Sequence, residues 1–497
     1  MNGATIITTP RCILAAMRGG QGKTAVSVGV TRALIRQGRK VASFKKGPDY
    51  IDAAWLTRSA KSPCYNLDTF LLGDDPVLDS FVKHARHADM AVIEGARGLF
   101  DGMDQQGSYS TAALAALIQA PVVLVVDCSK ITRTAAALVL GCMTFDPEVT
   151  ISGVILNQVA RARHEDMLRA SIQDRCGVPV IGAMPRLKDF PFQERHLGLI
   201  PPQEHLTVDQ AVDQLADAVE NHIDLDALWA LSAGAPELRS SGRPGMSRLP
   251  MPHQRPRIGV IRDSAFQFYY PENLEALKEQ GADLVDISAL TDRFLPDIDA
   301  LYIGGGFPET HAAQLAGNET FRIALRQAVE DGLPVYAECG GAMYMGNTLV
   351  CDGREYPMVG ALPITYGLSR RPRGHGYTVC RVDRANPFFE QAQTLRGHEF
   401  HYSYVLEWDQ DAMTMAFTLE RGYGFDGAHD GACRHNVLAA YSHMHAAGEH
   451  GWAAGLIRSA IRYMGRKPPT PRVSLENGGK SLENQLKSVY KKVVGKT

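Results

Sequence analysis

The sequence predicts an α/β protein made of two successive domains, each built on its own parallel sheet. The chain has 497 residues, more than one hydrophobic core usually organises. Short, uniformly apolar runs alternate with stretches of helical periodicity, which is the pattern of βαβ units. A segment rich in Pro, Gly, Ser and Arg, residues 232–257, has no periodicity and separates two such patterns. The expected parts are a first domain (1–235), a linker (236–256), a second domain (257–465) and a basic flexible tail (466–497).

The predicted strands of the first domain are too uniformly apolar for a sheet with one face in water, so helices should cover both faces. These strands span residues 12–17, 41–44, 90–93, 121–126, 151–156 and 178–181. In the second domain we expect strands at 257–261, 284–287, 300–303 and 334–337, with helices at about 271–280 and 318–331. For the tail, a docking helix at about 482–494 is the alternative to a flexible segment.

Composition excludes several classes of protein. Apolar residues make up 45% and charged residues 21% of the chain, as in ordinary soluble domains. A net charge of −2 provides no electrostatic reason to expect nucleic acid or a membrane as the main partner. The nine cysteines form no CxxC pair, which argues for a reducing compartment. No signal peptide and no apolar run of membrane-spanning length is evident, so we expect a cytoplasmic protein.

A phosphate-binding loop is predicted where the strand at 12–17 runs into the segment RGGQGKT and then into a helix at 24–36. Backbone N–H groups of the glycine-rich turn and the helix N-terminus cradle phosphate oxygens, the lysine reaches the β- and γ-phosphates, and the hydroxyl binds Mg²⁺. Met17 takes the first glycine position of the usual GxxxxGKT pattern. The tighter GGxGKT form is similar to that of the partitioning-ATPase and dethiobiotin-synthetase superfamily. The predicted ATP-binding residues are Gly19, Gly20, Gly22, Lys23 and Thr24.

Acidic side chains follow two further strands of the first domain. The segments KKGPDYID (45–52) and EGARGLFDG (94–102) each begin where a buried strand ends, and the loops at that edge of a parallel sheet converge on ligands. Beside a phosphate-binding loop, such carboxylates suit Mg²⁺ or the activation of an attacking oxygen; solvated loop residues are the alternative. Asn157 ends another strand and is either a reader of the adenine edge or an ordinary turn residue.

A thiol site is predicted in the second domain, where the strand at 334–337 runs into Glu-Cys-Gly-Gly and a helix. On such a turn the thiol of Cys339 is exposed to substrate, and the helix N-terminus favours its thiolate. The candidate oxyanion donors are backbone N–H groups: that of Gly340, and those of Gly305 and Gly306 in the loop GGGFPE (304–309). The segment AYSHMH (440–445) supplies a candidate base, although an isolated cysteine is more often a small buried hydrophobe.

These motifs, in this order, resemble the cobyrinate a,c-diamide synthase family of glutamine amidotransferases. The resemblance covers most of residues 10–465. It rests on GGQGKT, KKGPDYID, YNLD (65–68), EGARGLFDG, ILNQV, YIGGGFPE, YAECGGAMY, RGHEFHYS (396–403) and YSHMH. It implies an N-terminal P-loop domain of the dethiobiotin-synthetase type and a C-terminal domain of the class I glutamine amidotransferase type.

The resemblance implies a carbon–nitrogen ligase of cobalamin biosynthesis. Its first domain would use ATP and Mg²⁺ to phosphorylate side-chain carboxylates of a tetrapyrrole, at the a and c positions of cobyrinate or a close relative. Its second domain would hydrolyse L-glutamine through a cysteine thioester and pass ammonia internally to the acyl phosphate. A homodimer is compatible with this picture.

Site roles follow from the matching motifs. Cys339 would be the nucleophile and His443 the base. The predicted metal ligands are Thr24, Asp49 and Glu94, and the predicted substrate residues are Tyr50, Ile51, Asp52, Asp101 and His398.

Departures from the family pattern leave alternatives open. Many class I glutaminases place Glu two residues after the catalytic His, and here that residue is His445, so another group must orient His443. Arg18 and Met17 replace the small or hydroxyl residues usual in cobyrinate enzymes, which makes siroheme an alternative substrate. A nucleotide-switched partitioning ATPase is a second class of function, but it has no need of a Cys–His glutaminase. An inactive scaffold is a third.

Overall fold

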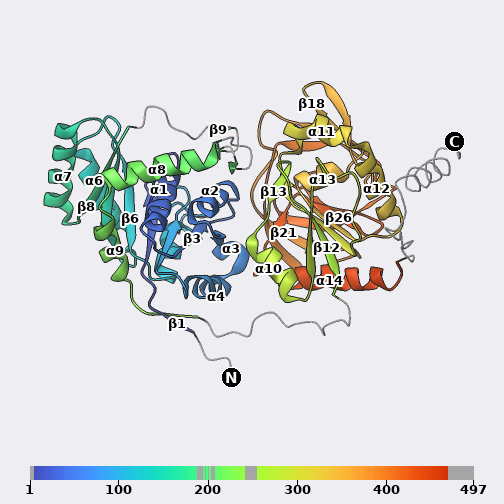
Figure 1. Cartoon of the computed structure of the whole chain (residues 1–497), viewed down its shortest axis with the longest axis horizontal. Helices are drawn as coiled ribbons and strands as arrows, with labels where there is room; N and C mark the ends of the chain where they lie inside the picture. The colour runs from blue at the N-terminus through green and yellow to red at the C-terminus, as the bar shows by residue number, and fades with distance from the viewer. Residues whose placement is uncertain are drawn as a thin grey trace, which may run out of the picture.

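The computed structural model describes residues 5–186, 207–240 and 255–467, together with 194–195, 198–199 and 201–202. It contains two α/β domains that lie side by side (Figure 1). Most of the predicted linker and the tail beyond residue 467, with its alternative helix, lie outside the described residues. At the start of the predicted linker, β11 (Leu238–Arg239) pairs with β1 (Ile6–Ile7), so this part of the chain is bound to the first domain. The predicted domain boundaries stay predictions.

In the described part of the first domain, seven strands form one sheet in which every neighbouring pair is parallel. Its carboxyl edge therefore gathers the loops after several strands, including the phosphate-binding loop. In order across the sheet, the strands are β4 (Tyr65–Leu67), β3 (Val41–Lys46), β5 (Met90–Glu94), β2 (Arg11–Ala16), β6 (Val122–Asp127), β7 (Ile151–Val159) and β8 (Val180–Pro185).

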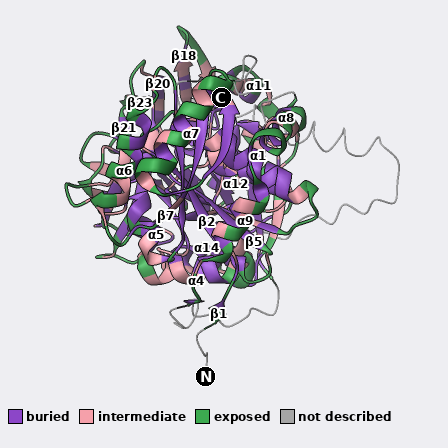
Figure 2. Ribbon diagram, turned by 90° about the vertical axis from the view of Figure 1, so that its left-hand side faces the viewer, coloured by how far each residue is buried: buried purple, intermediate pink, exposed green. Residues whose placement is uncertain are grey.

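Helices cover both faces of this sheet, as the apolar strands predict. Side chains alternate along β2, so that Cys12 and Leu14 join one core and Ile13 and Ala15 the other. All of β2 is buried, and Figure 2 shows its ribbon enclosed between the helices. One face packs on α1 (Lys23–Arg36), α8 (Val208–His222) and α9 (Leu225–Ala233). The other packs on α3 (Thr69–Leu72), α4 (Asp74–Ala85), α5 (Thr111–Leu117), α6 (Thr134–Phe145) and α7 (Ala162–Cys176), while α2 (Ile51–Ala60) packs beside α1.

The second domain has a mixed sheet that is parallel in one half and antiparallel in the other. The sequence predicted four of the five parallel strands; it did not predict the fifth, at 437–440, or the antiparallel half. The parallel strands are β14 (Asp283–Ile287), β12 (Arg257–Ile261), β15 (Ala300–Ile303), β17 (Val335–Glu338) and β26 (Val437–Ala440). The antiparallel strands are β25 (His429–Arg434), β24 (Thr414–Arg421), β21 (Gly374–Val382), β22 (Thr394–His401) and β27 (His443–Met444).

Two groups of helices enclose the parallel half of this sheet. On one face lie α10 (Pro271–Glu279) and α14 (Gly451–Met464), and on the other lie α11 (Ala312–Gly317), α12 (Glu319–Glu330) and α13 (Gly340–Met345), preceded by the 3₁₀ helix η2 (Pro308–His311). Helix α10 also faces the first domain (Figure 1). Smaller sheets join β19 (Arg354–Pro357), β18 (Thr348–Cys351), β20 (Ile364–Leu368) and β23 (Ser403–Trp408); β13 (Phe266–Phe268) with β16 (Gly305–Gly306); and β9 (Glu194–Arg195) with β10 (Gly198–Leu199).

None of the helices in the described residues combines the length and apolar character needed to cross a membrane.

The packing of α14 makes a stability prediction. A Cβ at Gly455 would collide with the backbone carbonyl of Phe388, which cannot rotate away. We therefore expect Gly455→Ala to destabilise the protein by about 1–3 kcal/mol, seen as a lower thermal unfolding temperature. Gly141 in α6 is the matched control, because a Cβ there meets open space, and Gly141→Ala should stabilise by about 0.5–1 kcal/mol. Equal unfolding temperatures for wild type and Gly455→Ala would contradict the packing.

Candidate active site

The predicted phosphate-binding loop has a defined backbone conformation. Gly20 and Gly22 adopt left-handed φ angles of 70° and 84°, and α1 begins at Lys23. The side-chain oxygen of Gln21 accepts hydrogen bonds from the N–H groups of Met17 (2.8 Å) and Arg18 (3.2 Å), which closes the loop on itself. Only glycine fits at position 22, because a Cβ there would collide with the amide of Asn157. The loop therefore presents a helix N-terminus to its ligand, as phosphate binding requires.

Asn157 and Lys23 both bind to this loop. The Asn157 amide donates to the carbonyl of Gln21 at 2.9 Å, so Asn157 positions the loop, and its predicted adenine contact stays a prediction. The Lys23 ammonium donates to the carbonyls of Arg97 (2.7 Å) and Arg18 (3.3 Å). Burial and the charge of Lys45 lower the pKa of Lys23. Lys23 thus lies inside the loop, where a γ-phosphate would meet it.

Glu94 lies at the centre of the predicted metal and carboxylate site. It is fully buried, and its Oε1 accepts hydrogen bonds from the Thr24 hydroxyl (2.7 Å) and the Lys45 ammonium (2.9 Å). Lys45 also donates to Asp52 at 2.7 Å. Burial raises the pKa of Glu94 to about 7, against the charge of Lys45. The structure thus brings Thr24, Glu94 and Asp52 together around Lys45.

A Mg²⁺ ion fits beside Thr24 and Glu94. The second oxygen of Glu94 is buried and makes no hydrogen bond to any described residue, and it is available as a ligand next to the Thr24 hydroxyl. No group of three or more His, Cys, Asp or Glu in the described segments is arranged to hold a metal by itself. Mg²⁺ in nucleotide sites is commonly held by one or two protein groups, phosphate oxygens and water, so this partial set suffices.

The remaining predicted residues of this site are more dispersed. Asp49 is exposed, and its carboxylate accepts a hydrogen bond from the Asp52 N–H at 2.8 Å at the start of α2. Asp101 is exposed and accepts from the Gly98 N–H at 2.9 Å, although its charge also acts on Lys23. Ile51 is buried in the core beneath α2. The metal role of Asp49 and the substrate roles of Ile51, Asp52 and Asp101 stay predictions.

Cys339 lies on a strained turn between β17 and α13. Its φ and ψ angles are 48° and −101°, a conformation that non-glycine residues rarely adopt and that is typical of a nucleophile at a strand-to-helix turn. The thiol is buried. Burial and the negative charge of Glu309 raise its pKa, whereas the sequence led us to expect a thiolate favoured by the helix. The α13 helix has only six residues, too few to outweigh burial, so the thiol needs a base.

The predicted oxyanion glycines and the predicted base gather around this turn. A Cβ at Gly340 would approach the backbone nitrogen of Gly306 to 3.1 Å, and a Cβ at Gly305 would lie 2.7 Å from Cε1 and 3.4 Å from Nε2 of His443. The Nε2 edge of the imidazole therefore faces the glycine loop. The fold thus brings the glycine loop close both to the residue after Cys339 and to His443, and the nucleophile, base and oxyanion roles stay predictions.

Glu338 contacts His443 and is the candidate for the orienting group that the sequence did not identify. Its Oε2 lies 3.2 Å from Nδ1 of His443, and both side chains are buried. The carboxylate also accepts hydrogen bonds from the Tyr302 hydroxyl (3.2 Å) and the Met444 N–H (3.3 Å), which fix its position. The pairing of β17 with β26 sets Glu338 opposite Ala440, three residues before the base. One sequence signal could have identified Glu338: it is an acidic residue at the end of a buried strand, directly before the cysteine.

Tyr50 of the first domain touches the predicted glutaminase base. Its ring lies 5.3 Å from the His443 ring, 5.6 Å from His398, 4.5 Å from Tyr270 and 5.2 Å from Phe268, all in the second domain. His398 itself stacks on His443 at 4.9 Å and is buried. The segment that carries Asp49, just before α2, therefore reaches the predicted base, and the two predicted centres meet at the domain interface.

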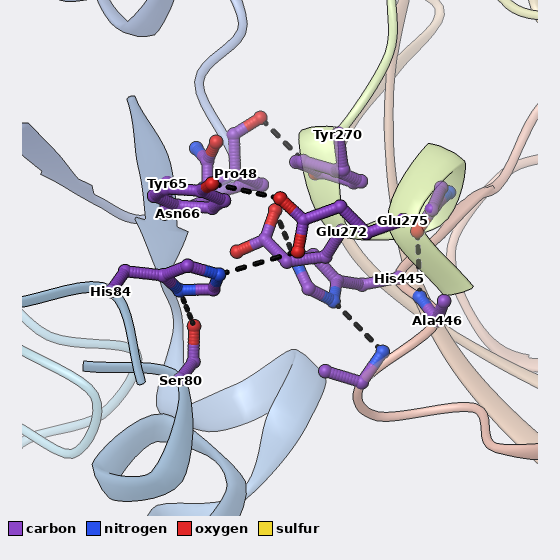
Figure 3. Close-up of polar contacts among 12 residues, drawn as sticks. Pro48, Tyr65, Asn66, Ser80, His84, Tyr270, Glu272, Glu275, His445 and Ala446 are labelled. Atoms are coloured by element: carbon purple, nitrogen blue, oxygen red, sulfur yellow. Dashed lines mark hydrogen bonds and ion pairs between the residues drawn. The ribbon is translucent and has the colours of Figure 1, made fainter. Parts of the chain in front are cut away.

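The YNLD segment, to which the sequence assigned no role, holds the domains together. Tyr65 donates to Glu275 of α10 at 2.8 Å, and His84 approaches the same carboxylate (Figure 3). Asp68 accepts a hydrogen bond from Tyr377 of the second domain at 2.7 Å. Asn66 donates to the carbonyls of Gly47 (2.8 Å) and Asp49 (3.0 Å) and so supports the loop that carries Tyr50.

Comparisons with known proteins agree with this geometry. Residues 12–199 match the model of the CobQ/CobB/MinD/ParA nucleotide binding domain, and residues 257–451 match that of the CobB/CobQ-like glutamine amidotransferase domain. The cobyrinate a,c-diamide synthase of Magnetococcus marinus is 44% identical over 90% of this chain and 97% of its own length. Those of Archaeoglobus fulgidus and Methanothermobacter thermautotrophicus are 39% and 38% identical, each over 91% of this chain and at least 98% of their own lengths.

The predicted fold class and family are both confirmed. The chain has an N-terminal nucleotide-binding domain with a parallel sheet, followed by a C-terminal glutamine amidotransferase domain. The relatives named above, all cobyrinate a,c-diamide synthases, align with both domains. The chain belongs to the cobyrinate a,c-diamide synthase family.

Proposed function

We propose that the protein is an ATP-dependent carbon–nitrogen ligase that amidates the a and c carboxylates of cobyrinate with nitrogen from glutamine. The observation that carries this proposal is the meeting of the two centres at Tyr50, 5.3 Å from the His443 ring and one residue from Asp49. The predicted enzyme class agrees with the family of the relatives. A cytoplasmic location, a homodimer and the absence of nucleic-acid and membrane partners stay predictions.

In the first domain, a substrate carboxylate oxygen attacks the γ-phosphorus of ATP, ADP leaves, and an acyl phosphate forms. The N–H groups of Gly20 and Gly22 hold the phosphates, and Lys23 stabilises charge on the transferred group. Thr24 and Glu94 would hold Mg²⁺, which would neutralise phosphate charge when bound. Lys45 is buried and held by Glu94 and Asp52, and it adds a fixed positive charge beside the carboxylates of this site.

In the second domain, His443 takes the proton of the Cys339 thiol, and the sulfur attacks the carboxamide carbon of glutamine. Glu338 accepts the Nδ1–H of His443, which leaves Nε2 as the basic nitrogen on the edge that faces Gly305. Collapse of the oxyanion returns that proton to the leaving nitrogen and releases ammonia. Water then hydrolyses the thioester to glutamate and regenerates the thiol.

Ammonia then attacks the acyl carbon, and phosphate leaves as the amide forms. Ammonia that escaped to water would be protonated and lose its nucleophilicity, and the contact between Tyr50 and His443 supports this step by keeping the two centres close together. A partitioning ATPase would need none of the second-domain arrangement.

Glutamine hydrolysis and ATP-dependent amidation can be separated by substitutions in the two domains. Cys339→Ala should abolish amidation supported by glutamine, because no thioester can form, and retain amidation supported by ammonium chloride. Lys23→Ala is the reciprocal variant and should lose amidation with either nitrogen source. Amide formation is followed by mass spectrometry and glutamate release by a coupled assay. Glutamine-supported activity in Cys339→Ala, or full activity in Lys23→Ala, would refute the assigned roles.

Glu338 should act through the orientation of His443. We expect Glu338→Gln to lower the kcat of glutamine hydrolysis by about 10²–10⁴-fold, as loss of an orienting carboxylate does in serine hydrolases, with a smaller change in KM. Ammonium-supported amidation should be unchanged, and Glu338→Asp should recover part of the glutaminase rate. A parallel loss of both activities would instead indicate a structural role.

The substrate is tested by incubating the purified protein with ATP, Mg²⁺, glutamine and one of cobyrinate, hydrogenobyrinate, siroheme or nickel-sirohydrochlorin. Conversion of each carboxylic acid to an amide lowers the mass by about one unit. We expect two such conversions for cobyrinate and none for siroheme. Selective conversion of siroheme would overturn the substrate and leave the ligase mechanism intact.

A further inference from the structure

Two cations without a direct partner lie beside the phosphate-binding loop. Lys46 ends β3, and Arg97 lies in the loop that follows β5. Among the described residues, neither the ammonium of Lys46 nor the guanidinium of Arg97 makes a hydrogen bond or an ion pair. The preceding lysine, Lys45, is by contrast held by two carboxylates.

Lys46 is a buried side chain whose charged end remains accessible. Its relative exposure is 7%, and its ammonium nitrogen is not among the fully buried polar atoms that lack a hydrogen bond, so it keeps contact with solvent. Asp68 is the nearest acid, but its carboxylate already accepts hydrogen bonds from the N–H groups of Phe70 and Leu71 and from the Tyr377 hydroxyl. Because a charge at this depth is costly without a partner, an anion at this position would be favourable.

The fold places Arg97 close to Lys46. Strands β3 and β5 are parallel neighbours, so the loops that follow them leave the sheet side by side. A Cβ at Gly47 would lie 3.8 Å from the Cβ of Ala96, which shows that the two loops touch one residue beyond Lys46 and one residue before Arg97. Burial lowers the pKa of Lys46, and the charge of Arg97 adds to this effect. An anion between the two cations would relieve their repulsion.

The backbone of Arg97 is strained and fixed beside the predicted phosphate site. Its φ angle is 51°, in the left-handed region that favours glycine. Its carbonyl accepts a hydrogen bond from the Lys23 ammonium at 2.7 Å, and the residue as a whole is exposed. The base of the side chain is therefore held next to Lys23, while the guanidinium has room for a ligand.

Strand β21 of the second domain borders the same space. His375 and Tyr377 lie two residues apart on this strand. Burial and the charge of Arg97 lower the pKa of His375, and that charge also acts on Tyr377. Tyr377 in turn stacks on Phe70 of the first domain at 4.2 Å. The guanidinium therefore lies between the phosphate-binding loop and the second domain.

The charge and position of this pair indicate which ligand it suits. Lys46 lies near one carboxylate, that of Asp68, so one positive charge of the pair is left without a balancing acid. A carboxylate carries one charge, and its two oxygens can bind a guanidinium in a bidentate manner and an ammonium at the same time. The ATP phosphates are assigned to the loop glycines and Lys23, whereas the Arg97 side chain extends toward the second domain.

We propose that Lys46 and Arg97 bind a carboxylate of the tetrapyrrole other than the one being amidated. This anchor positions the substrate so that its reacting carboxylate meets the phosphate site at Lys23. The inference rests on the proposed ligase function and adds to it two residues that determine substrate affinity.

The test measures the binding of cobyrinate to the full-length protein by equilibrium dialysis, without ATP or glutamine, so that no turnover is needed. We expect Arg97→Gln to raise the Kd by about tenfold or more, the scale of losing a hydrogen bond between charged groups. Lys46→Met, which keeps the length of the side chain and removes its charge, should act in the same direction, and Arg97→Lys should recover part of the affinity. Added salt should weaken binding less in Arg97→Gln than in wild type.

Steady-state assays with ammonium chloride as the nitrogen source distinguish substrate from nucleotide. The KM for cobyrinate should rise in Arg97→Gln, and the KM for ATP should stay within about twofold of wild type. A raised KM for ATP with an unchanged Kd for cobyrinate would assign the two cations to phosphate and overturn the proposal.

Lys61→Gln is the matched control, because Lys61 is also exposed with a left-handed φ angle, 53°, but lies at the C-terminal end of α2. It should leave the Kd unchanged. A wild-type Kd in Arg97→Gln overturns the anchor, as does equal weakening in Lys61→Gln, which would mean general attraction only. Arg97 is exposed, so this comparison holds even if Lys46→Met does not fold. A wild type that binds cobyrinate through Arg97 but forms no amide with either nitrogen source would refute the ligase function and leave the anchor intact.

Discussion

The contact between the loop after β3 and the second domain is the constraint on which the rest of the structure depends. Tyr50 packs against His443, His398 and Tyr270, and the same loop carries Asp49 and Asp52 toward Lys45. The contact brings the two predicted centres together, as the proposed exchange of uncharged ammonia requires. The YNLD segment maintains this contact from both sides, since Asn66 binds the loop and Tyr65 and Asp68 bind the second domain.

Both centres hold charges and backbone conformations that would be unfavourable elsewhere. Lys45 and Glu94 are buried together, and the cost of removing them from water is offset by their mutual hydrogen bond and by Thr24 and Asp52. Cys339 has a positive φ angle that the surrounding strand and helix must enforce. Buried charges and strained backbone angles persist where the surrounding packing holds them in place. The buried core of each domain provides that packing.

The glutaminase centre also shows how one sheet can replace a missing residue. Relatives of the wider class often place a glutamate two positions after the base, whereas here His445 takes that position. The parallel pairing of β17 with β26 brings Glu338 to the base from the neighbouring strand instead. His445 pairs instead with Glu272 of α10 in the same domain, at 3.6 Å.

Local features of the chain were readable from the sequence because their signals are local. Uniformly apolar strands, the GGQGKT turn and the Glu-Cys-Gly-Gly elbow each lie within a few residues. They predicted the fold class, which is confirmed, and a phosphate-binding loop and a nucleophile, which stay predictions. Tertiary structure decided what depends on contacts between distant segments: the antiparallel half of the second sheet, the contact of Glu338 with His443, the binding of Asn157 to the loop and the pairing of Glu272 with His445. Strand pairing and domain contact set these distances across tens to hundreds of residues, and no periodicity in the chain encodes them.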